Sequence, residues 1–267
     1  MVEVKYKERL GNNLFQYCLG RIISQQLGYR LQAGVIPHFP HTAMRIDGQD
    51  YSSYPSQTFT GQRIDLKSIF NDKTKRKIVL DGFFQRYEYY EEHKNLIRSW
   101  LAPGVKLVEP INADDILLCV RRTDCVPDYA LPLSYYQEAL ARASYARVFI
   151  CTDDVNDWFV RELQKRYNAI IWTRDIMDDF AFCMLFNKIV IANSTFHWWA
   201  AFLSQAQEIY FPEIWFRNCP DIDLRVSDES RYIYIKCSEK YRSTINDKIG
   251  QVSRGIKRKL RDVGIYL

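Results

Sequence analysis

Apolar residues recur in a regular pattern along the second half of the chain. Short apolar runs typical of buried strands stand at residues 116–120, 147–151, 169–172, 188–192 and 208–211. Segments with the apolar spacing of a helix lie between most of these runs, at residues 134–143, 156–167, 179–186 and 196–204. This alternation predicts an α/β fold with a parallel sheet that carries helices on both faces.

The first half of the chain is less regular. Residues 14–27 predict a helix that ends at Gly28, and Gly11 with Asn12 predicts a turn before it. The segment 34–76 has no clear period and predicts loops with short strands. Further elements are predicted as strands at residues 2–6 and 77–80, a helix at residues 89–100, and a linker at residues 103–110.

Polar residues stand directly after three of the predicted strands. The carboxyl ends of parallel strands meet at one edge of a sheet, where the ligands of such folds bind. We therefore expect these residues to form the functional site. They are Arg121, Arg122 and Asp124, then Asp153 and Asp154, then Asn193, Ser194 and Thr195.

The arginine pair points to a phosphate ligand. A planar guanidinium donates hydrogen bonds in a fork that fits phosphate oxygens. A fixed guanidinium also stabilises the charge that a leaving diphosphate gains as its bond breaks. Asp124 is expected to orient one of the arginines. The alternative, equally compatible with these residues alone, is an exposed arginine pair neutralised by Asp124.

The other polar groups each allow two interpretations. Residues 193–195 open a predicted helix, where a hydroxyl caps the helix and free N–H groups bind an anion. Asp153 and Asp154 either contact a nucleoside or cap the helix that follows. The amides of residues 11–13 can bind sugar hydroxyls or phosphate, although the glycine spacing is not that of a phosphate-binding loop.

Charge and cysteine content narrow the function classes. A net charge of +5 suits an anionic ligand or a membrane surface and is too small to argue for nucleic acid. Seven cysteines without a Cys-x-x-Cys pair predict reduced core thiols rather than disulfides or zinc. None of the four histidines stands at metal-ligand spacing, and the Asp-x-Asp at residues 221–223 is expected in a surface turn. We therefore predict no metal.

The two ends of the chain bear on its location. The first ten residues lack the apolar core of a signal peptide, and no run approaches the ~20 apolar residues of a membrane span. The expected location is cytoplasmic. The segment 254–261 (RGIKRKLR) is basic, and Ile256, Leu260 and Val263 fall on one helical side. It predicts either a helix that contacts an anionic membrane surface or a solvated helix docked on the body by one face.

Five stretches of the chain, in order, resemble the motifs of one enzyme family. Residues 10–17 (LGNNLFQY) are similar to L-G-N-Q-M-F-Q-Y, and residues 119–124 (CVRRTD) to H-x-R-R-x-D. Residues 152–154 (TDD) are similar to S-D-D, residues 191–199 (IANSTFHWW) to I-A-N-S-T-F-S-W-W, and residues 211–216 (FPEIWF) to A-P-x-x-W-F. Together they resemble the α-1,2-fucosyltransferases, glycosyltransferase family 11 of the GT-B fucosyltransferase superfamily.

The resemblance implies a GT-B-like fold, in which two Rossmann-like domains with parallel sheets face a cleft. Residues 1–110 would form the acceptor-side domain, and residues 111–267 the GDP-fucose-binding domain with its basic C-terminal helix. It further implies inverting transfer of L-fucose from GDP-fucose to a glycan hydroxyl, without metal or other cofactor, in an α-1,2 linkage to galactose. The alternatives are a superfamily fucosyltransferase with another linkage or a protein acceptor, and a non-catalytic GDP- or glycan-binding module.

Within this resemblance the donor-side residues take specific roles. Arg122, helped by Arg121, is expected to neutralise the departing GDP, and residues 193–195 are expected to support its phosphates. Asp153 and Asp154 are expected near the nucleoside.

The other side of the expected cleft is assigned more sparsely. Gly11, Asn12 and Gln16 are expected to face the donor sugar or the acceptor. His38 and His41 either touch the acceptor or are solvated loop residues.

The catalytic base has no motif of its own. Asp124 is expected to be structural, and Asp128 is the candidate base. Two departures from the family pattern stand near the expected site. Cys119 replaces the motif histidine, and Glu8 with Arg9 replaces the usual Gly-Gly.

Overall fold

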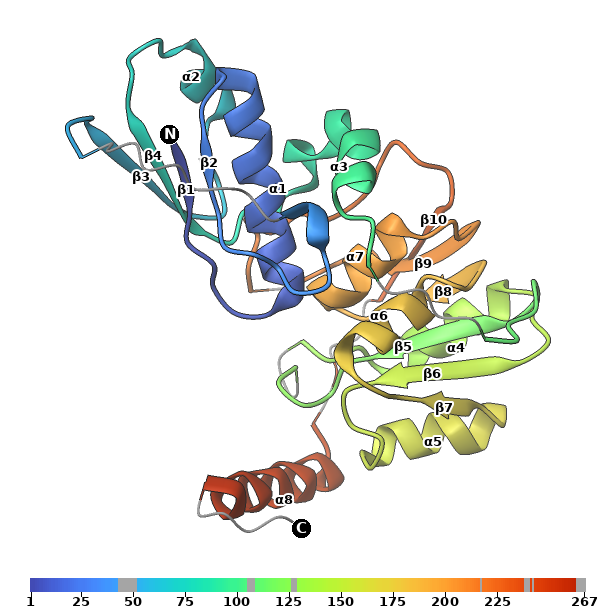
Figure 1. Ribbon diagram of the computed structural model, residues 1–267. Coiled ribbons are helices and arrows are strands. Elements are labelled where there is room, and N and C mark those ends of the chain that lie inside the picture. Colours follow the sequence, from blue (N-terminus) through green and yellow to red (C-terminus); the bar gives the residue numbers. More distant parts are fainter. Residues whose placement is uncertain are drawn as a thin grey trace.

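Two parallel sheets, each flanked by helices, form the two lobes of the protein, and a long C-terminal helix lies along one edge of the second lobe (Figure 1). The structure is a computed structural model. It describes residues 1–42, 52–104, 109–125, 129–216, 218–237, 241 and 243–262.

The N-terminal sheet has four parallel strands in the order β2-β1-β4-β3. These strands are β1 (Val2–Val4), β2 (Leu31–Gln32), β3 (Ser56–Gly61) and β4 (Lys77–Gly82). Helix α1 (Leu10–Leu27) packs against three of them and against α2 (Leu66–Asn71). Three short 3₁₀ segments (Pro40–Thr42, Tyr87–Tyr89 and Glu91–His93) and helix α3 (Lys94–Trp100) complete the lobe.

The C-terminal sheet has six parallel strands in the order β10-β9-β8-β5-β6-β7. The strands are β5 (Ile116–Val120), β6 (Val148–Thr152), β7 (Ile170–Trp172), β8 (Lys188–Val190), β9 (Glu208–Pro212) and β10 (Tyr232–Ile235). The helices are α4 (Leu133–Arg142), α5 (Trp158–Tyr167), α6 (Ile176–Cys183), α7 (Thr195–Leu203) and α8 (Ile245–Asp262).

Strand β5 is buried along its whole length because helices cover both faces of the sheet. Successive side chains of a strand point to opposite faces. Leu117 and Cys119 accordingly belong to the cluster that contains α6 and α7, whereas Leu118 packs with α4 and α5. The predicted α/β fold with helices on both faces of a parallel sheet is confirmed. Strand β10 was not predicted.

Helix α1 begins four residues earlier than predicted, at Leu10. Gly11 and Asn12 therefore lie in its first turn, and the prediction of a turn there was wrong. Turn-forming residues are tolerated at this position because the first N–H groups of a helix need no partner within it. The predicted end at Gly28 is confirmed, since Gly28 adopts the left-handed conformation, with φ 63°, that terminates many helices.

The two lobes meet where α1 packs on α7. The ring centroid of Phe15 lies 4.9 Å from that of Trp198 and 4.7 Å from that of Trp199. One buried apolar cluster accordingly runs through both lobes. The chain passes from one sheet to the other between β4 and β5, and the expected domain boundary at residue 110 stays a prediction.

The cysteines and the helices bear on two further expectations. All seven cysteines are free, and five of them are buried, as predicted for core thiols. In the described part of the chain, no helix combines the length and apolar character needed to cross a membrane.

Candidate functional site

The strand order of the C-terminal sheet creates a crevice between β5 and β8. The chain runs outward from β5 through β6 to β7, then crosses to β8 on the other side of β5. The connections after β5 and β8 therefore leave in opposite directions, and ligands of open parallel sheets bind between them. Arg121 follows β5 and Asn193 follows β8 shortly after its last residue, so both stand at this crevice.

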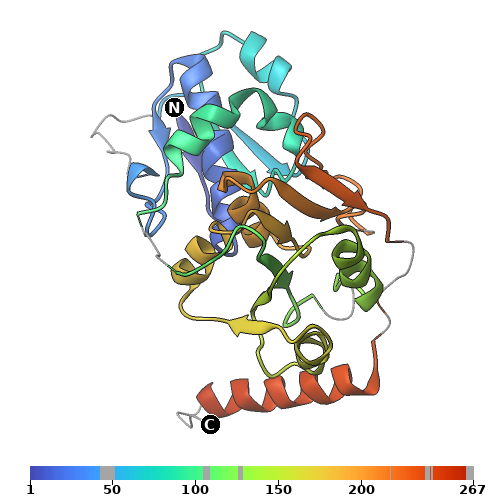
Figure 2. The same ribbon diagram turned by 90° about the vertical axis from the view of Figure 1, so that its right-hand side faces the viewer.

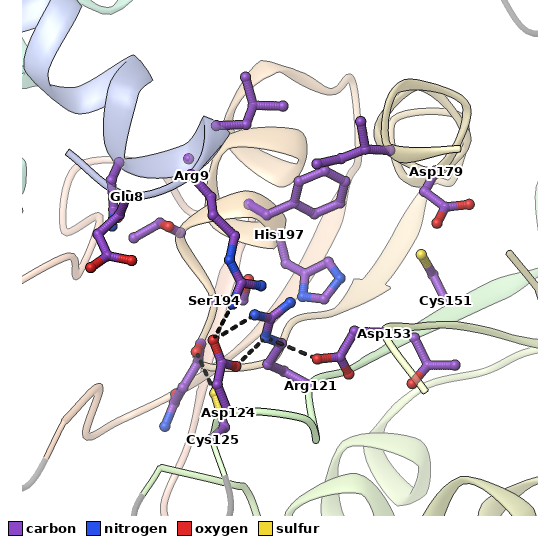
Figure 3. Close-up of a pocket in the computed structure, with 18 of the residues that line it drawn as sticks. Glu8, Arg9, Arg121, Asp124, Cys125, Cys151, Asp153, Asp179, Ser194 and His197 are labelled. Atoms are coloured by element: carbon purple, nitrogen blue, oxygen red, sulfur yellow. Dashed lines mark hydrogen bonds and ion pairs between the residues drawn. The ribbon is translucent and has the colours of Figure 1, made fainter. Parts of the chain in front are cut away.

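A pocket of about 510 Å³ opens at the crevice. Small-molecule sites commonly measure about 300–1,000 Å³. The start of α1 and the residues before it form one wall, and the strand ends of the C-terminal sheet form the other (Figure 3). The lining includes Glu8, Arg9, Gly11 and Asn12 from the first wall, and Arg121, Asp124, Asp153, Asn193, Ser194, Thr195 and His197 from the second.

Arg121 faces this pocket and is held in place by two carboxylates. Its Nε and Nη2 atoms donate to the two oxygens of Asp124, both at 2.8 Å, and Nε lies 3.1 Å from Asp153. Figure 3 shows the guanidinium near both acids and beside the ring of His197. Asp124 thus orients an arginine, as expected. Burial works to raise the pKa of Asp124, but the hydrogen bond and charge of Arg121 outweigh it and lower that pKa.

Arg122 does not line the pocket. Its guanidinium is only 1% exposed and donates from Nε to Asp157 at 2.9 Å and from Nη2 to Asp247 of α8 at 2.5 Å. The hydroxyl of Tyr241 accepts a further hydrogen bond from Nη2 at 2.8 Å. Both carboxylates are almost fully buried, so the cation is neutralised inside the protein. This placement revises the expected roles: Arg121, not Arg122, is available to a ligand in the pocket.

The start of α7 supplies the second group that suits an anion. Ser194 occupies the N-cap position, but its side chain makes no capping hydrogen bond. The first N–H groups of a helix lack intrahelical partners and carry partial positive charge. The buried Oδ1 of Asn193 likewise has no partner among the described residues. Residues Asn193, Ser194 and Thr195 line the pocket, so the structure brings them together with Arg121.

The two aspartates after β6 lie in different surroundings and have different partners. Asp153 lines the pocket and accepts hydrogen bonds from the backbone N–H groups of Arg122 and Thr123 at 2.8 and 3.1 Å. Asp154 is not among the lining residues and pairs with Arg254 of α8 at 3.0 Å. The cap of α5 is Asp157. Only Asp153 is therefore placed to contact a ligand directly.

The N-terminal wall contains some of the expected residues and lacks one. Gly11 and Asn12 line the pocket. Gln16 is fully buried beneath it: its Oε1 accepts from the Lys7 N–H, and its Nε2 donates to the Gly82 carbonyl. The expectation that Gln16 faces the donor is corrected, because both ends of its amide are engaged in joining β4 to the segment before α1.

The remaining expected residues lie away from the pocket or outside the described part. His38 and His41 are exposed and do not line it. Asp128, the candidate base, lies outside the described residues. The roles of all three stay predictions.

Sequence reasoning did not single out His197 as a site residue. Its side chain is 5% exposed, and its Nδ1 has no hydrogen-bond partner among the described residues. Burial, helped by the positive charge of Arg121, lowers the pKa of His197 to about 3, so the ring stays neutral at physiological pH. The motifs contained a signal for this residue. The chain has His197 where the family motif has serine, and Cys119 where the motif has histidine, so the histidine has changed position between two motifs.

These two departures meet in space. The ligand atoms of Cys119, Cys183 and His197 all lie within 4.8 Å of one another in the core beside the pocket. The three buried side chains are the group in the described structure that could hold a metal ion. Histidine and cysteine at this location suit a soft ion such as zinc. Asp221 and Asp223 are not part of this group: they pair with Arg63 and Arg225.

Two further acids, Glu8 and Asp179, line the pocket without a guanidinium partner in the described structure, and Asp179 is the more buried of them. Asp179 of α6 accepts from the Arg174 N–H at 2.8 Å and from the Thr173 hydroxyl at 3.3 Å. Burial raises the pKa of Asp179, which gives the carboxylate a greater affinity for a proton. A carboxylate of this kind in a pocket is a candidate general base.

A comparison with protein families tests the resemblance drawn from the motifs. Residues 111–233 match glycosyl transferase family 11. The family resemblance drawn from the motifs is thereby confirmed over the C-terminal sheet, which includes Arg121, Asp153 and Asn193. The family 11 match does not include residues 10–17, and no curated protein matches the chain.

Two solved structures are similar to this chain at low identity. One is NodZ, an α-1,6-fucosyltransferase soaked with GDP-fucose, with 14% identity and a TM-score of 0.47, covering 78% of this chain and 93% of NodZ. The other is a mutant of Arabidopsis thaliana FUT1 in complex with GDP, with 13% identity and a TM-score of 0.46, covering 79% of this chain and 70% of FUT1.

Proposed function

We propose that the protein is an inverting glycosyltransferase that transfers L-fucose from GDP-fucose to a glycan hydroxyl. The observation that carries this proposal is that Arg121 and the start of α7 line the same pocket. This pocket opens at the crevice of the sheet whose residues match glycosyl transferase family 11. A guanidinium and a helix N-terminus are both groups that bind phosphate. The donor is named on the strength of the family 11 match and of the motif resemblance to the α-1,2-fucosyltransferases.

In this proposal the diphosphate lies between Arg121 and residues 193–195. Asp124 and Asp153 hold the guanidinium in one orientation before the donor arrives. A preorganised cation stabilises the charge that develops on the leaving diphosphate more than the charge of the bound donor. Arg122 contributes indirectly, because it fixes the loop after β5 from inside the core.

The transfer step joins the acceptor oxygen to the anomeric carbon of fucose from the face opposite the diphosphate. The bond between that carbon and the diphosphate oxygen breaks, and its electron pair leaves with GDP. The proton of the acceptor hydroxyl passes to a base. We assign the base to Asp179, because Asp124 and Asp153 pair with Arg121. The remaining acid of the lining, Glu8, is exposed, whereas burial raises the pKa of Asp179.

His197 completes the donor side of the pocket in this proposal. Its neutral ring lies beside Arg121, and its buried Nδ1, which has no partner among the described residues, can bond a ligand or an ordered water. It therefore acts as a positioning residue for the guanidinium and the phosphates. The transfer is proposed to need no metal, because Arg121 and the helix N-terminus supply the positive charge that the leaving group requires.

The acceptor is proposed to be galactose, joined through an α-1,2 linkage, on the strength of the motif resemblance. The test is incubation with GDP-fucose and paired acceptors ending in galactose or N-acetylglucosamine, followed by determination of the linkage by NMR. Fucose on O2 of galactose supports the proposal. Transfer to N-acetylglucosamine or to a protein favours another superfamily enzyme, and GDP binding by calorimetry without any transfer favours a non-catalytic module.

The metal expectation has its own test. The enzyme is treated with EDTA and with a zinc-selective chelator and assayed for transfer, and its metal content is measured. Undiminished transfer by metal-free protein supports the proposal, whereas loss of transfer that zinc restores would assign a metal role to Cys119, Cys183 and His197.

A further inference from the structure

Helix α8 has an apolar face that no described part of the chain covers. Ile245, Ile249, Val252 and Ile256 are 75%, 60%, 63% and 53% exposed. Their spacing of four, three and four residues places them on one side of the helix. We call these four residues the apolar stripe. In a soluble protein, large apolar side chains gathered in this way mark an interaction surface.

The opposite side of α8 is docked on the C-terminal lobe, against α5 and the segments that follow β5 and β6. Asp247 is buried and bonds to Arg122, to the indole N–H of Trp158 at 2.8 Å and to Tyr241. Arg254, two turns further on, pairs with Asp154 at 3.0 Å. At about 100° per residue these contacts stand on the far side of the helix from the apolar stripe. Figure 2 shows α8 lying across the lower edge of the molecule, beyond α5.

The docked contacts fix the direction of the apolar stripe. A helix tied down only by its polar side cannot turn the stripe inward without breaking the buried pair of Asp247 and Arg122. That rupture leaves a buried charge unpaired, which is strongly unfavourable. The ion pairs of Asp247 and Arg254 therefore hold the helix so that the apolar stripe faces outward.

Charge decides between the partners that could cover this stripe. Lys248 and Lys259 are exposed on α8, and the helix contains six basic residues against two acidic ones, of which Asp247 is buried. An apolar stripe flanked by lysines is the pattern of helices that lie in the interface of an anionic bilayer. The lysine stems cover apolar surface while their ammonium groups reach the lipid phosphates. A second copy of this chain would instead bring two sets of like charges together.

We propose that α8 docks on the surface of a membrane that contains anionic lipid, with the apolar stripe inserted among the headgroups. This surface is distinct from the donor pocket, which opens at the ends of β5 and β8. The helix lies in the plane of the membrane surface and does not cross the bilayer. Binding is expected to weaken with added salt, because screening shortens the reach of the lysine charges.

Flotation of the full-length protein with vesicles tests the proposal. The vesicles consist of phosphatidylcholine alone or of phosphatidylcholine mixed with phosphatidylglycerol. The wild type is expected to float with the mixed vesicles and to bind phosphatidylcholine at least tenfold more weakly. I249S/V252S/I256S is expected to lose binding to both, and K248E/K259E to lose the preference for anionic lipid.

Two controls separate this surface from a general loss of structure. V35S/L96S removes two exposed apolar side chains elsewhere, which are 63% and 50% exposed, and is expected to float like the wild type. GDP binding by calorimetry is expected to be unchanged in every variant, so a failure of α8 docking remains distinguishable from a failure of the proposed function. Absence of wild-type flotation, or normal flotation of the stripe variant, would overturn the proposal. A dimer that the stripe variant converts to a monomer, without lipid binding, would also overturn it.

Discussion

The adjacent arginines provide the sharpest test of the site, because the structure gives them opposite tasks. Arg122→Ala leaves the carboxylate of Asp247, which is 0% exposed, without its cation. Asp157, which is 2% exposed, keeps only the longer 3.6 Å contact with Arg254. Removing one partner of a buried ion pair costs about 3–5 kcal/mol, and here one cation serves two acids. Since domains of this kind have about 5–15 kcal/mol of total stability, the variant is expected to unfold at much lower urea concentration.

Arg121→Ala is expected to show the reverse behaviour. Its ion pair with Asp124, which is 50% exposed, contributes no more than about 1 kcal/mol to stability. Asp153, its other partner, keeps the hydrogen bonds from the N–H groups of Arg122 and Thr123. Loss of a fixed donor beside developing charge lowers turnover by about 10²–10³. The assays are urea unfolding followed by circular dichroism, GDP calorimetry and transfer kinetics. Arg142→Ala, which removes an exposed arginine paired with Glu138, serves as the control and should alter neither property.

Two results would refute this division of labour. One is an Arg122→Ala protein as stable as the wild type but inactive, which would return the catalytic role to Arg122. The other is near-normal transfer by Arg121→Ala, which would remove the diphosphate from the proposed location.

Four further predictions concern the pocket walls. His197→Ser should weaken donor binding by about tenfold, which corresponds to the free energy of one good hydrogen bond. The exchange variant C119H/H197S should regain most of the lost affinity. Equal defects in the single and exchange variants would contradict the positioning role of His197. His197 also predicts a pH dependence of stability, because the unfolded chain binds a proton on this ring below about pH 6.5 and the folded protein does not. The free energy of unfolding should therefore fall by about 1.4 kcal/mol per pH unit between pH 6.5 and pH 3. Urea unfolding of His197→Asn at the same pH values should show no such fall from this residue. Asp179→Asn should lower kcat by about 10²–10⁴ and flatten the acidic limb of its pH profile, whereas an unchanged profile would exclude Asp179 as the base. Gly11→Ala should destabilise the protein by about 1–3 kcal/mol, as measured by urea unfolding, because the new Cβ would lie 2.5 Å from Oγ1 of Thr195 and 2.6 Å from the Phe196 nitrogen.

The sequence was sufficient to predict the C-terminal sheet because its strands are nearly continuous apolar runs. Residues 116–120 are buried along both faces, so no alternation was needed to recognise them as a strand. Strand β10 was missed because Tyr232–Ile235 is a short strand that follows a polar segment. The early start of α1 was missed because its first residues favour turns when judged by local preference alone.

The location of the site could be predicted, but the direction of its side chains could not. Strand ends fix where Arg121 and Asn193 lie, since the backbone determines both. Which arginine of the pair turns inward depends on Asp247, 125 residues away on α8. The role of Gln16 likewise depends on the Gly82 carbonyl, 66 residues away. Contacts at such separations leave no periodic trace in the sequence.

The close approach of α1 and α7 bears on how acceptor choice could be engineered. Under the proposed function the N-terminal lobe is the acceptor side, so exchanging it for that of a relative is a route to a new acceptor specificity. A foreign α1 would arrive with its own surface, however, and Gly11 tolerates no side chain against Thr195. The ring of Phe15 would have to match Trp198 and Trp199 as well. The exchangeable unit is therefore the N-terminal lobe together with α7, and a graft that respects only the sheet boundary would misalign the two walls of the pocket.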